Sequence, residues 1–230
     1  MSNDPGHDDD SGLLLRSGLA FNGRITASVT HELNNVIGTI MQVVGLIEDL
    51  ALSDEVKQAG LSDRMLSVVE RIERQADRGT ALIKRLNTFA HLSDKERAEC
   101  QLGDLLTTMA NLSERLVGLK KATLIRSGLS QEVTVITNPI QLAHVVFGCI
   151  DAVLNASSAG DEIELRLSLI DIGGLVEVVA RGVSDPEQIA IGADTRMVAE
   201  RLGLSINSAA DGGATRIQIA VPLRSEDGSG

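Results

Sequence analysis

Apolar residues in the first part of the chain recur at alternating intervals of four and three. The series is Val29, Leu33, Val36, Ile40, Val43, Ile47 and Leu50. This spacing is typical of a helix that presents one apolar seam to another helix, as in a coiled coil. The sequence therefore predicts a long helix that starts near Arg24.

A second seam of the same kind follows a short polar segment. It runs through Met65, Val69, Ile72, Ala76, Gly79, Ile83, Leu86 and Ala90, with Val68, Leu82 and Phe89 beside it. Residues 53–62 carry charges and Gly60, and must reverse the chain. Two such helices form an antiparallel hairpin. Because one hairpin cannot bury both seams well, we expect two hairpins to pair as a homodimeric four-helix bundle.

The periodicity changes after Ser93. Helices are predicted over residues 102–116, 139–156 and 194–202, and strands over 123–126, 133–137, 162–170, 175–180, 204–207 and 215–221. The helix at 139 is marked by the start signal Asn138-Pro139. In the strand over 162–170, polar Glu162, Glu164 and Arg166 alternate with apolar residues, which is typical of a strand with one buried face.

These elements predict an α+β chain, with a two-helix hairpin followed by a two-layer α/β sandwich of mostly antiparallel strands. We expect a disordered acidic tail over residues 1–20 and the hairpin over residues 21–95. The sandwich is expected over residues 96–224, with a short tail over residues 225–230.

The composition of the chain excludes some classes of binding partner. The chain has a formal net charge of −11, three Phe and no Trp or Tyr. Nucleic acids and anionic membranes need a basic face, and single-stranded nucleic acid needs aromatic stacking platforms, so neither is an expected partner. Cys100 and Cys149 show no metal-ligand spacing. With no basic leader and no long apolar span, we expect a cytoplasmic protein.

One histidine lies where its surroundings suggest chemistry. His31 falls about 180° from the first seam and shares its outer face with Asn34, Asn35 and Gly38, while Glu32 lies at the shoulder. A neutral, oriented imidazole attacks phosphorus, and a neighbouring carboxylate can accept its second ring N–H. A lone exposed histidine is more often a solvated polar residue, and the neighbours favour the chemical interpretation. The mixed charges from Glu70 to Arg78 are interpreted as a solvated face.

The segment Ser28-Val29-Thr30-His31-Glu32-Leu33-Asn34-Asn35-Val36 resembles the phosphoacceptor motif of bacterial sensor histidine kinases. The resemblance implies that His31 carries a phosphoryl group, with Glu32 as its acid/base partner. Asn35 matches the position tied to phosphatase activity, and Asn34 and Gly38 fall where a partner would dock. The usual proline after that position is Val36 here.

The second domain resembles the ATP-binding domain of the same kinases, with its nucleotide residues replaced. Two asparagines expected on the helix that starts at Asn138-Pro139 fall at Gly148 and Ala152, and the adenine-binding aspartate falls at Ala180. A methyl group cannot hold Mg²⁺, which requires oxygen ligands. No glycine-rich lid lies between Ser184 and Arg196. We therefore expect no ATP, no other cofactor and no metal site.

This combination resembles the bacterial histidine phosphotransferases that are built as a kinase-like hairpin with a degenerate ATPase-like domain. Such a protein relays phosphoryl groups between receiver-domain aspartates of response regulators and hybrid kinases, here through His31. His–Asp phosphotransferase activity is then expected, and ATP-dependent kinase activity is not. Two alternatives stay open: a non-catalytic dimeric pseudokinase scaffold or regulator, and a divergent active kinase or phosphatase.

Overall fold

The computed structural model describes residues 5–52, 62–183 and 185–223. It divides the chain into a helical unit, Thr26–Thr88, and an α/β unit of Phe89–Gly230 together with Met1–Ile25. The boundaries expected at residues 20 and 95 therefore shift, because the first turns of the long helix belong to the α/β unit.

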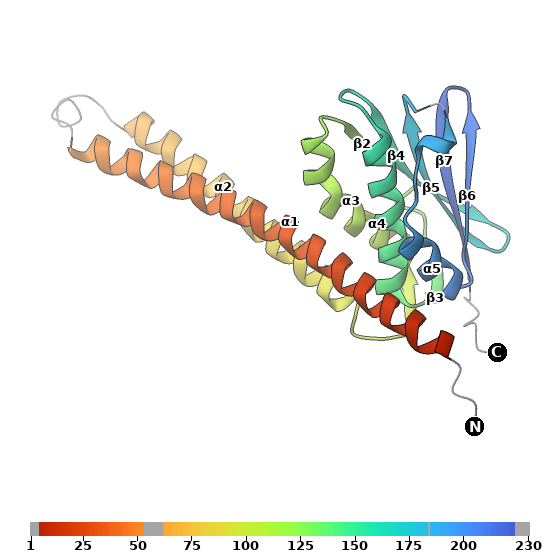
Figure 1. The fold of residues 1–230 in the computed structure, drawn as a ribbon. Coiled ribbons are helices and arrows are strands. Elements are labelled where there is room, and N and C mark those ends of the chain that lie inside the picture. Colours follow the sequence, from red (N-terminus) through yellow and green to blue (C-terminus); the bar gives the residue numbers. More distant parts are fainter. Residues whose placement is uncertain (1–4, 53–61, 184, 224–230) are drawn as a thin grey trace. The chain divides into compact units, whose positions relative to one another are not determined.

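The predicted hairpin consists of helix α1, Pro5–Leu52, and helix α2, Ser62–His91 (Figure 1). The expected disordered tail does not extend to residue 20, because α1 begins at Pro5. Proline suits the first position of a helix, where its missing N–H costs no hydrogen bond. The predicted reversal over residues 53–62 lies almost entirely outside the described residues.

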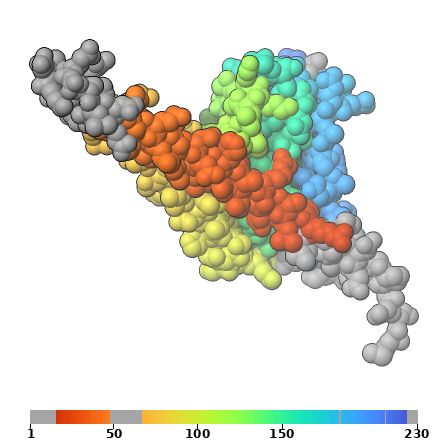
Figure 2. Space-filling model, turned by 60° about the vertical axis from the view of Figure 1, so that its left-hand side comes forward, coloured from red at the N-terminus to blue at the C-terminus, as the bar shows by residue number. Residues whose placement is uncertain are grey.

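The two helices of the hairpin lie side by side (Figure 2) and pack along one stripe of small and branched side chains. Its buried members in the helical unit are Val29, Val36 and Val43 of α1 and Val68, Gly79 and Leu82 of α2. The second predicted seam is therefore divided between buried and exposed residues in this single chain. Val69 and Ile83 are 43% and 52% exposed, and their neighbours Val68 and Leu82 are buried instead. The apolar surface of α2 is wider than one helix–helix contact can cover.

The α/β unit contains two sheets and three longer helices. Its strands are β1, Ala98–Gln101; β2, Thr123–Ser127; β3, Thr134–Thr137; β4, Glu162–Ile170; β5, Gly173–Arg181; β6, Ser205–Asp211; and β7, Ala214–Pro222. Its helices are α3, Leu102–Leu119; α4, Pro139–Ala156; α5, Ala193–Arg201; and the 3₁₀ turn η1, Pro186–Gln188. Sequence patterning predicted all of these except β1 and η1, each of which has no more than four residues.

The main sheet has the order β2-β4-β5-β7-β6 and is antiparallel except for the parallel pair β2–β4. One face carries the apolar residues of β4, β5 and β7, such as Leu165, Val178 and Ile219, all fully buried. Helices α3, α4 and α5 lie on one side of the sheet (Figure 1). Helix α4 starts as predicted, because the Asn138 side chain accepts a hydrogen bond from the Gln141 N–H at 3.1 Å.

The other face of the sheet carries an ion-pair network. Glu164 lies on this outward face, as its alternation with apolar residues predicted, but it is only 4% exposed. Arg166 and Arg181 donate to its two carboxylate oxygens at 2.9 and 2.8 Å. Burial alone raises the pKa of Glu164, but hydrogen bonds from Ser127, Arg166 and Arg181 outweigh it and lower that pKa to about 2. Glu164 therefore stays ionised while buried, because cations from two strands cover it.

Both cysteines are buried and free, as small apolar residues would be. Burial raises the pKa of Cys149 to about 12 and that of Cys100 to about 11, so neither forms a thiolate near pH 7. Helix α4 is long and apolar enough to cross a membrane by composition alone, but two-thirds of it is buried within the protein. It is the core helix of the α/β unit.

Candidate functional site

The face of α1 that was expected to carry the chemistry is polar and open to solvent. The side chains of His31, Asn34 and Asn35 lie on it, and His31 and Asn35 are exposed. Gly38, two turns beyond His31, is half-buried, and nothing lies within 4 Å of the point that a Cβ atom would occupy there. A partner protein can therefore approach this face of α1 closely.

Asn35 is the residue that contacts the His31 ring. Its amide nitrogen lies 3.3 Å from Nδ1 of His31, one helical turn away. Asn35 also accepts a hydrogen bond at its backbone carbonyl from the Thr39 hydroxyl at 2.9 Å. An amide N–H that donates to Nδ1 favours the tautomer with its proton on Nε2. This contact therefore couples the Asn35 side chain to the tautomer of the His31 ring.

Glu32, the expected partner of the ring, has another partner. Its carboxylate oxygen accepts a hydrogen bond from Nη2 of Arg78 at 2.8 Å, and its side chain is 19% exposed. Arg78 lies on α2, so this ion pair crosses the hairpin. The charged residues from Glu70 to Arg78 are exposed, as predicted, and Arg78 in addition pairs with a residue of α1.

Next to this ion pair, helices α1 and α2 approach each other closely. A Cβ atom at Gly79 would lie 3.3 Å from Cγ1 of Val36, and both residues are buried. Val36 stands where the kinase resemblance leads one to expect proline, and α1 continues through it. Gly79 brings the backbone of α2 close enough for the adjacent Arg78 to reach Glu32. Sequence reasoning missed Arg78, and the glycine beside it in the seam was the available signal.

Helix α4 presents a covered face where the kinase resemblance places a nucleotide. A Cβ atom at Gly148 would lie 2.2 Å from the Thr195 hydroxyl oxygen of α5, so no side chain fits there. Ala152 is buried one turn further along. Ala180 is fully buried in β5, between Ile163 of β4 and Thr215 of β7.

The first turns of α1 cover the neighbouring part of α4 through an aromatic cluster. Phe21 stacks on the His144 ring, with centroids 4.8 Å apart and planes 6° apart. Its centroid also lies 5.5 Å from that of Phe147 and 5.4 Å from that of Phe89. These are the only three phenylalanines of the chain, and all three meet here.

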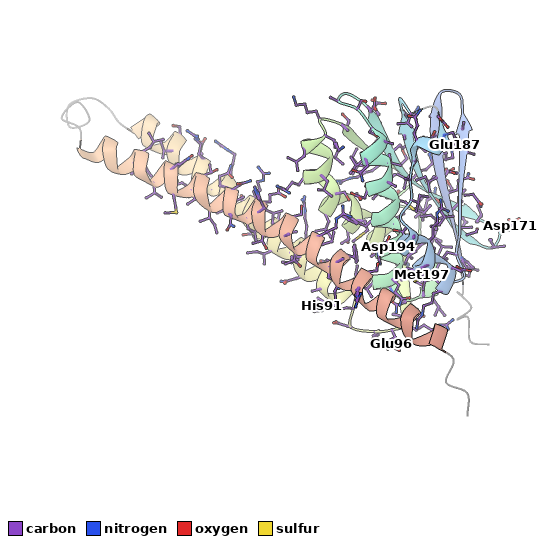
Figure 3. All side chains as sticks on the ribbon, viewed as in Figure 1. His91, Glu96, Asp171, Glu187, Asp194 and Met197 are labelled. Carbon is purple, nitrogen blue, oxygen red and sulfur yellow. The ribbon has the colours of Figure 1, made fainter. Side chains whose placement is uncertain are left out.

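Polar contacts border this cluster on both sides. Arg24 forms an ion pair with Asp151 and lies with its guanidinium carbon 5.1 Å from the Phe147 centroid. Ser17 donates to Asp194, at the start of α5 (Figure 3), at 3.0 Å. Its hydroxyl also lies 3.3 Å from Nε2 of His144. These contacts fix the segment from Ser17 to Arg24 on α4 and α5.

His144 is a buried polar residue, with only 6% of its surface exposed. Burial lowers the pKa of its imidazole, Arg24 acts in the same direction, and the carboxylate of Asp194 opposes them. Burial alone would raise the pKa of Asp194, but hydrogen bonds from Thr195 and Ser17, together with His144, keep it below its ordinary value. The ring that stacks on Phe21 is therefore neutral near pH 7.

A small cleft of about 230 Å³ remains beside these contacts. Its polar lining includes Arg24, Asp151, Asn155, Asp194 and Thr195. The volume is below the range of about 300–1,000 Å³ that is usual for small-molecule sites. Within the described residues, no group of three His, Cys, Asp or Glu side chains could hold a metal ion.

Comparison with known proteins gives the fold. No protein-family model matches the sequence, and no curated protein sequence matches it. The catalytic domain of histidine kinase ThkA, in a nucleotide-free form, is similar with a TM-score of 0.50 at 14% identity, over 57% of this chain and all of that chain.

Two further solved structures extend over more of the chain. One, described as a bacterial phosphotransferase, covers 88% of this chain and 96% of its own at 13% identity, with a TM-score of 0.48. Histidine kinase AdeS of Acinetobacter baumannii covers 84% of this chain and 98% of its own at 14% identity, with a TM-score of 0.46. The similarity to the ThkA catalytic domain shows that the sheet domain of this chain has the histidine kinase ATPase fold, and the helical hairpin precedes it in the sequence.

The aromatic cluster predicts the effect of Phe21→Ala. Phe21 is 4% exposed, and replacing a buried phenylalanine by alanine costs about 3–5 kcal/mol. We expect Phe21→Ala to lower the free energy of unfolding by about 3 kcal/mol in urea titrations followed by circular dichroism. Leu19→Ala is the matched control, because Leu19 lies on the same helix and is 63% exposed. Equal stabilities of the two variants would contradict the role given to Phe21.

Proposed function

We propose that this protein is a cytoplasmic histidine phosphotransfer protein of a two-component phosphorelay. It would take a phosphoryl group from the aspartate of one receiver domain onto His31 and give it to another, without binding ATP. Two observations support this most. His31 lies on a face of α1 that is open to solvent, and the face of α4 where the kinase resemblance places a nucleotide is covered, at Gly148, by Thr195. The kinase-like core supports the two-component setting.

The transfer step needs an imidazole nitrogen with a free lone pair at an accessible position. Nε2 of His31 would attack the phosphorus of an aspartyl phosphate, the N–P bond would form, and the P–O bond would break to release the aspartate carboxylate. The proton on Nδ1 then needs an acceptor, which the Glu32 carboxylate or the side-chain carbonyl oxygen of Asn35 can provide. Transfer to the second receiver is the reverse reaction.

The residues around His31 suit contact with a receiver domain. Asn34 lies beside Asn35 on the polar face, and the open space at Gly38 leaves room for a partner helix or loop. We assign these two positions to docking. In the kinase resemblance Asn35 is also the residue that orients a water molecule toward the phosphoryl group.

The α4 face disfavours nucleotide for reasons of space as well as chemistry. Gly148 has no room for the expected asparagine side chain because Thr195 is in contact with it. The methyl groups of Ala152 and Ala180 provide neither the Mg²⁺ ligand nor the adenine contact. Phe21 and Arg24 occupy the adjacent surface. These points favour phosphotransfer over the alternative of a divergent ATP-dependent kinase.

Dimerisation through the hairpin completes the proposal. Ile37, Met41 and Val44 recur at intervals of four and three on α1 and are exposed, as are Val69 and Ile83 on α2. Burial of apolar surface is worth about 25 cal/mol per Å². A second hairpin that covers this stripe would give the four-helix bundle that the two seams predict.

Removal of the nucleophile tests the central step. With a phosphorylated receiver domain as donor, the wild-type protein should acquire an acid-labile phosphoryl group, and His31→Ala should acquire none. Glu32→Ala should slow transfer about 10²-fold, because an acid/base partner assists the nucleophile without replacing it. The matched control is His91→Ala, since His91 (labelled in Figure 3) is also exposed at the end of α2 and paired with a carboxylate, that of Asp94, at 2.9 Å. Labelling of His31→Ala, or no exchange with any receiver, would favour a non-catalytic scaffold.

Nucleotide binding separates the relay from an active kinase. Calorimetric titration with a non-hydrolysable ATP analogue and Mg²⁺ should give no binding heat at micromolar protein concentration. Incubation with labelled ATP should leave His31 unlabelled. Micromolar affinity for the analogue would instead support the divergent kinase.

The dimer is tested by mass. Light scattering at micromolar concentration should report about twice the 24.3 kDa of one chain. Ile83→Asp should reduce this mass to that of a monomer, because it places a charge in the exposed apolar stripe. Gln42→Asp is the control, since Gln42 is exposed but polar. A wild-type particle of 24.3 kDa would exclude the bundle.

A further inference from the structure

Arg78 connects α2 to the His31 face of α1. Its guanidinium donates to the Glu32 carboxylate at 2.8 Å, and it reaches that far because Gly79 and Val36 bring the two helices together beside it. The ion pair of Arg74, one turn earlier on α2, is local, since Arg74 lies 3.6 Å from Glu70 of its own helix. Arg78 therefore differs from its neighbour in contacting the helix that carries His31.

The ion pair has a consequence for the His31 ring. Attack through Nε2 requires the tautomer that carries its proton on Nδ1, and this N–H needs an acceptor. The two candidate acceptors are the Glu32 carboxylate and the side-chain carbonyl oxygen of Asn35. Arg78 holds the first, and Asn35 presents its amide nitrogen to Nδ1. The described arrangement is thus one in which the reactive tautomer is not favoured.

We propose that Arg78 is a positioning residue that restrains His31 by holding Glu32 away from its ring. The inference rests on the proposed function, because it takes His31 as the nucleophile. Loss of the Arg78–Glu32 ion pair frees the carboxylate to accept the Nδ1 proton, which leaves the Nε2 lone pair available. A receiver domain that draws Arg78 away from Glu32 would activate His31 by this route.

Other charged residues lie on both helices near this pair. On α2, Arg71, Arg74, Asp77 and Arg85 lie within two turns of Arg78. On α1, Arg24 lies two turns before His31 and pairs with Asp151. Arg78 contacts the Glu32 carboxylate at 2.8 Å, so the test concentrates on this residue.

The test is a double-mutant cycle read from the ring itself. In full-length protein labelled with ¹⁵N-histidine, nitrogen chemical shifts report the share of the Nδ1–H tautomer of His31. An exposed ion pair in the upper part of the usual range is worth about 0.4–1 kcal/mol, so Arg78→Gln should raise the ratio of Nδ1–H to Nε2–H tautomer about two- to fivefold. In a Glu32→Gln background the same change should have no effect. Arg78→Lys should stay near the wild-type value, because it keeps the charge.

Arg74→Gln is the matched control, since it removes an equally exposed arginine one turn away. Chemical phosphorylation by potassium phosphoramidate gives a second readout without any receiver domain, because Nε2 of His31 displaces ammonia from phosphorus. Glu32→Gln should slow this reaction, and the slowing should be about two- to fivefold greater when Arg78→Gln is also present than when Arg78 is retained.

Two results would overturn the inference: an unchanged tautomer ratio in Arg78→Gln, or a change that persists in the Glu32→Gln background. Neither readout involves a receiver domain. Failure of receiver phosphotransfer would therefore count against the proposed function alone, and failure of the cycle against Arg78 alone.

Discussion

The stacking of Phe21 on His144 is the contact that joins the first turns of α1 to helix α4 of the α/β unit. The chain has three phenylalanines, and all of them meet at this point of α4. Aromatic pairs contribute beyond the apolar area that they bury, and Arg24 and Ser17 add polar contacts at the border. The first turns of α1 are thereby held as part of the α/β unit. A ligand on this part of α4 would have to displace a buried phenylalanine.

The positions that the kinase resemblance assigns to a nucleotide are packed against other parts of the α/β unit. Ala180 is fully buried in β5, and an aspartate at that position without a ligand would be a buried charge with no partner. Gly148 allows α5 to pack directly on α4 through Thr195. Ala180 lies on the same face of β5 as Val178, so it is part of the buried face of the sheet.

Sequence patterning predicted the elements whose signals are local. Asn138-Pro139 marked the start of α4, and the alternation around Glu162 and Arg166 marked β4. The exposure of His31 also followed from its angle to the first seam. What patterning missed depends on residues far apart in the chain. Phe21 of α1 meets His144 of α4, and no local period reveals that meeting.

The same limit applies to two carboxylates. Glu164 was placed on the outward side of its strand, and Arg166 of that strand and Arg181 of β5 cover it there. Arg78 was interpreted as one of several solvated charges, and it also pairs with Glu32 across the hairpin, beside the close contact at Gly79. In both cases at least one cation that contacts the carboxylate lies on a different helix or strand. The sequence around each carboxylate does not reveal that partner.

On helix α1, the apolar residues proposed for dimerisation and the polar residues proposed for phosphotransfer lie on different faces. On α1, Ile37, Met41 and Val44 form an exposed apolar stripe, whereas His31 and Asn35 lie on an exposed polar surface. Changes to the polar face therefore have little effect on packing, and changes to the stripe have little effect on the imidazole. The Arg78–Glu32 ion pair is the exception, because it joins the helix–helix contact at Gly79 to the residue beside the nucleophile. Under the proposed role of Arg78, a movement of α2 that breaks this ion pair would free the Glu32 carboxylate to accept a proton from His31.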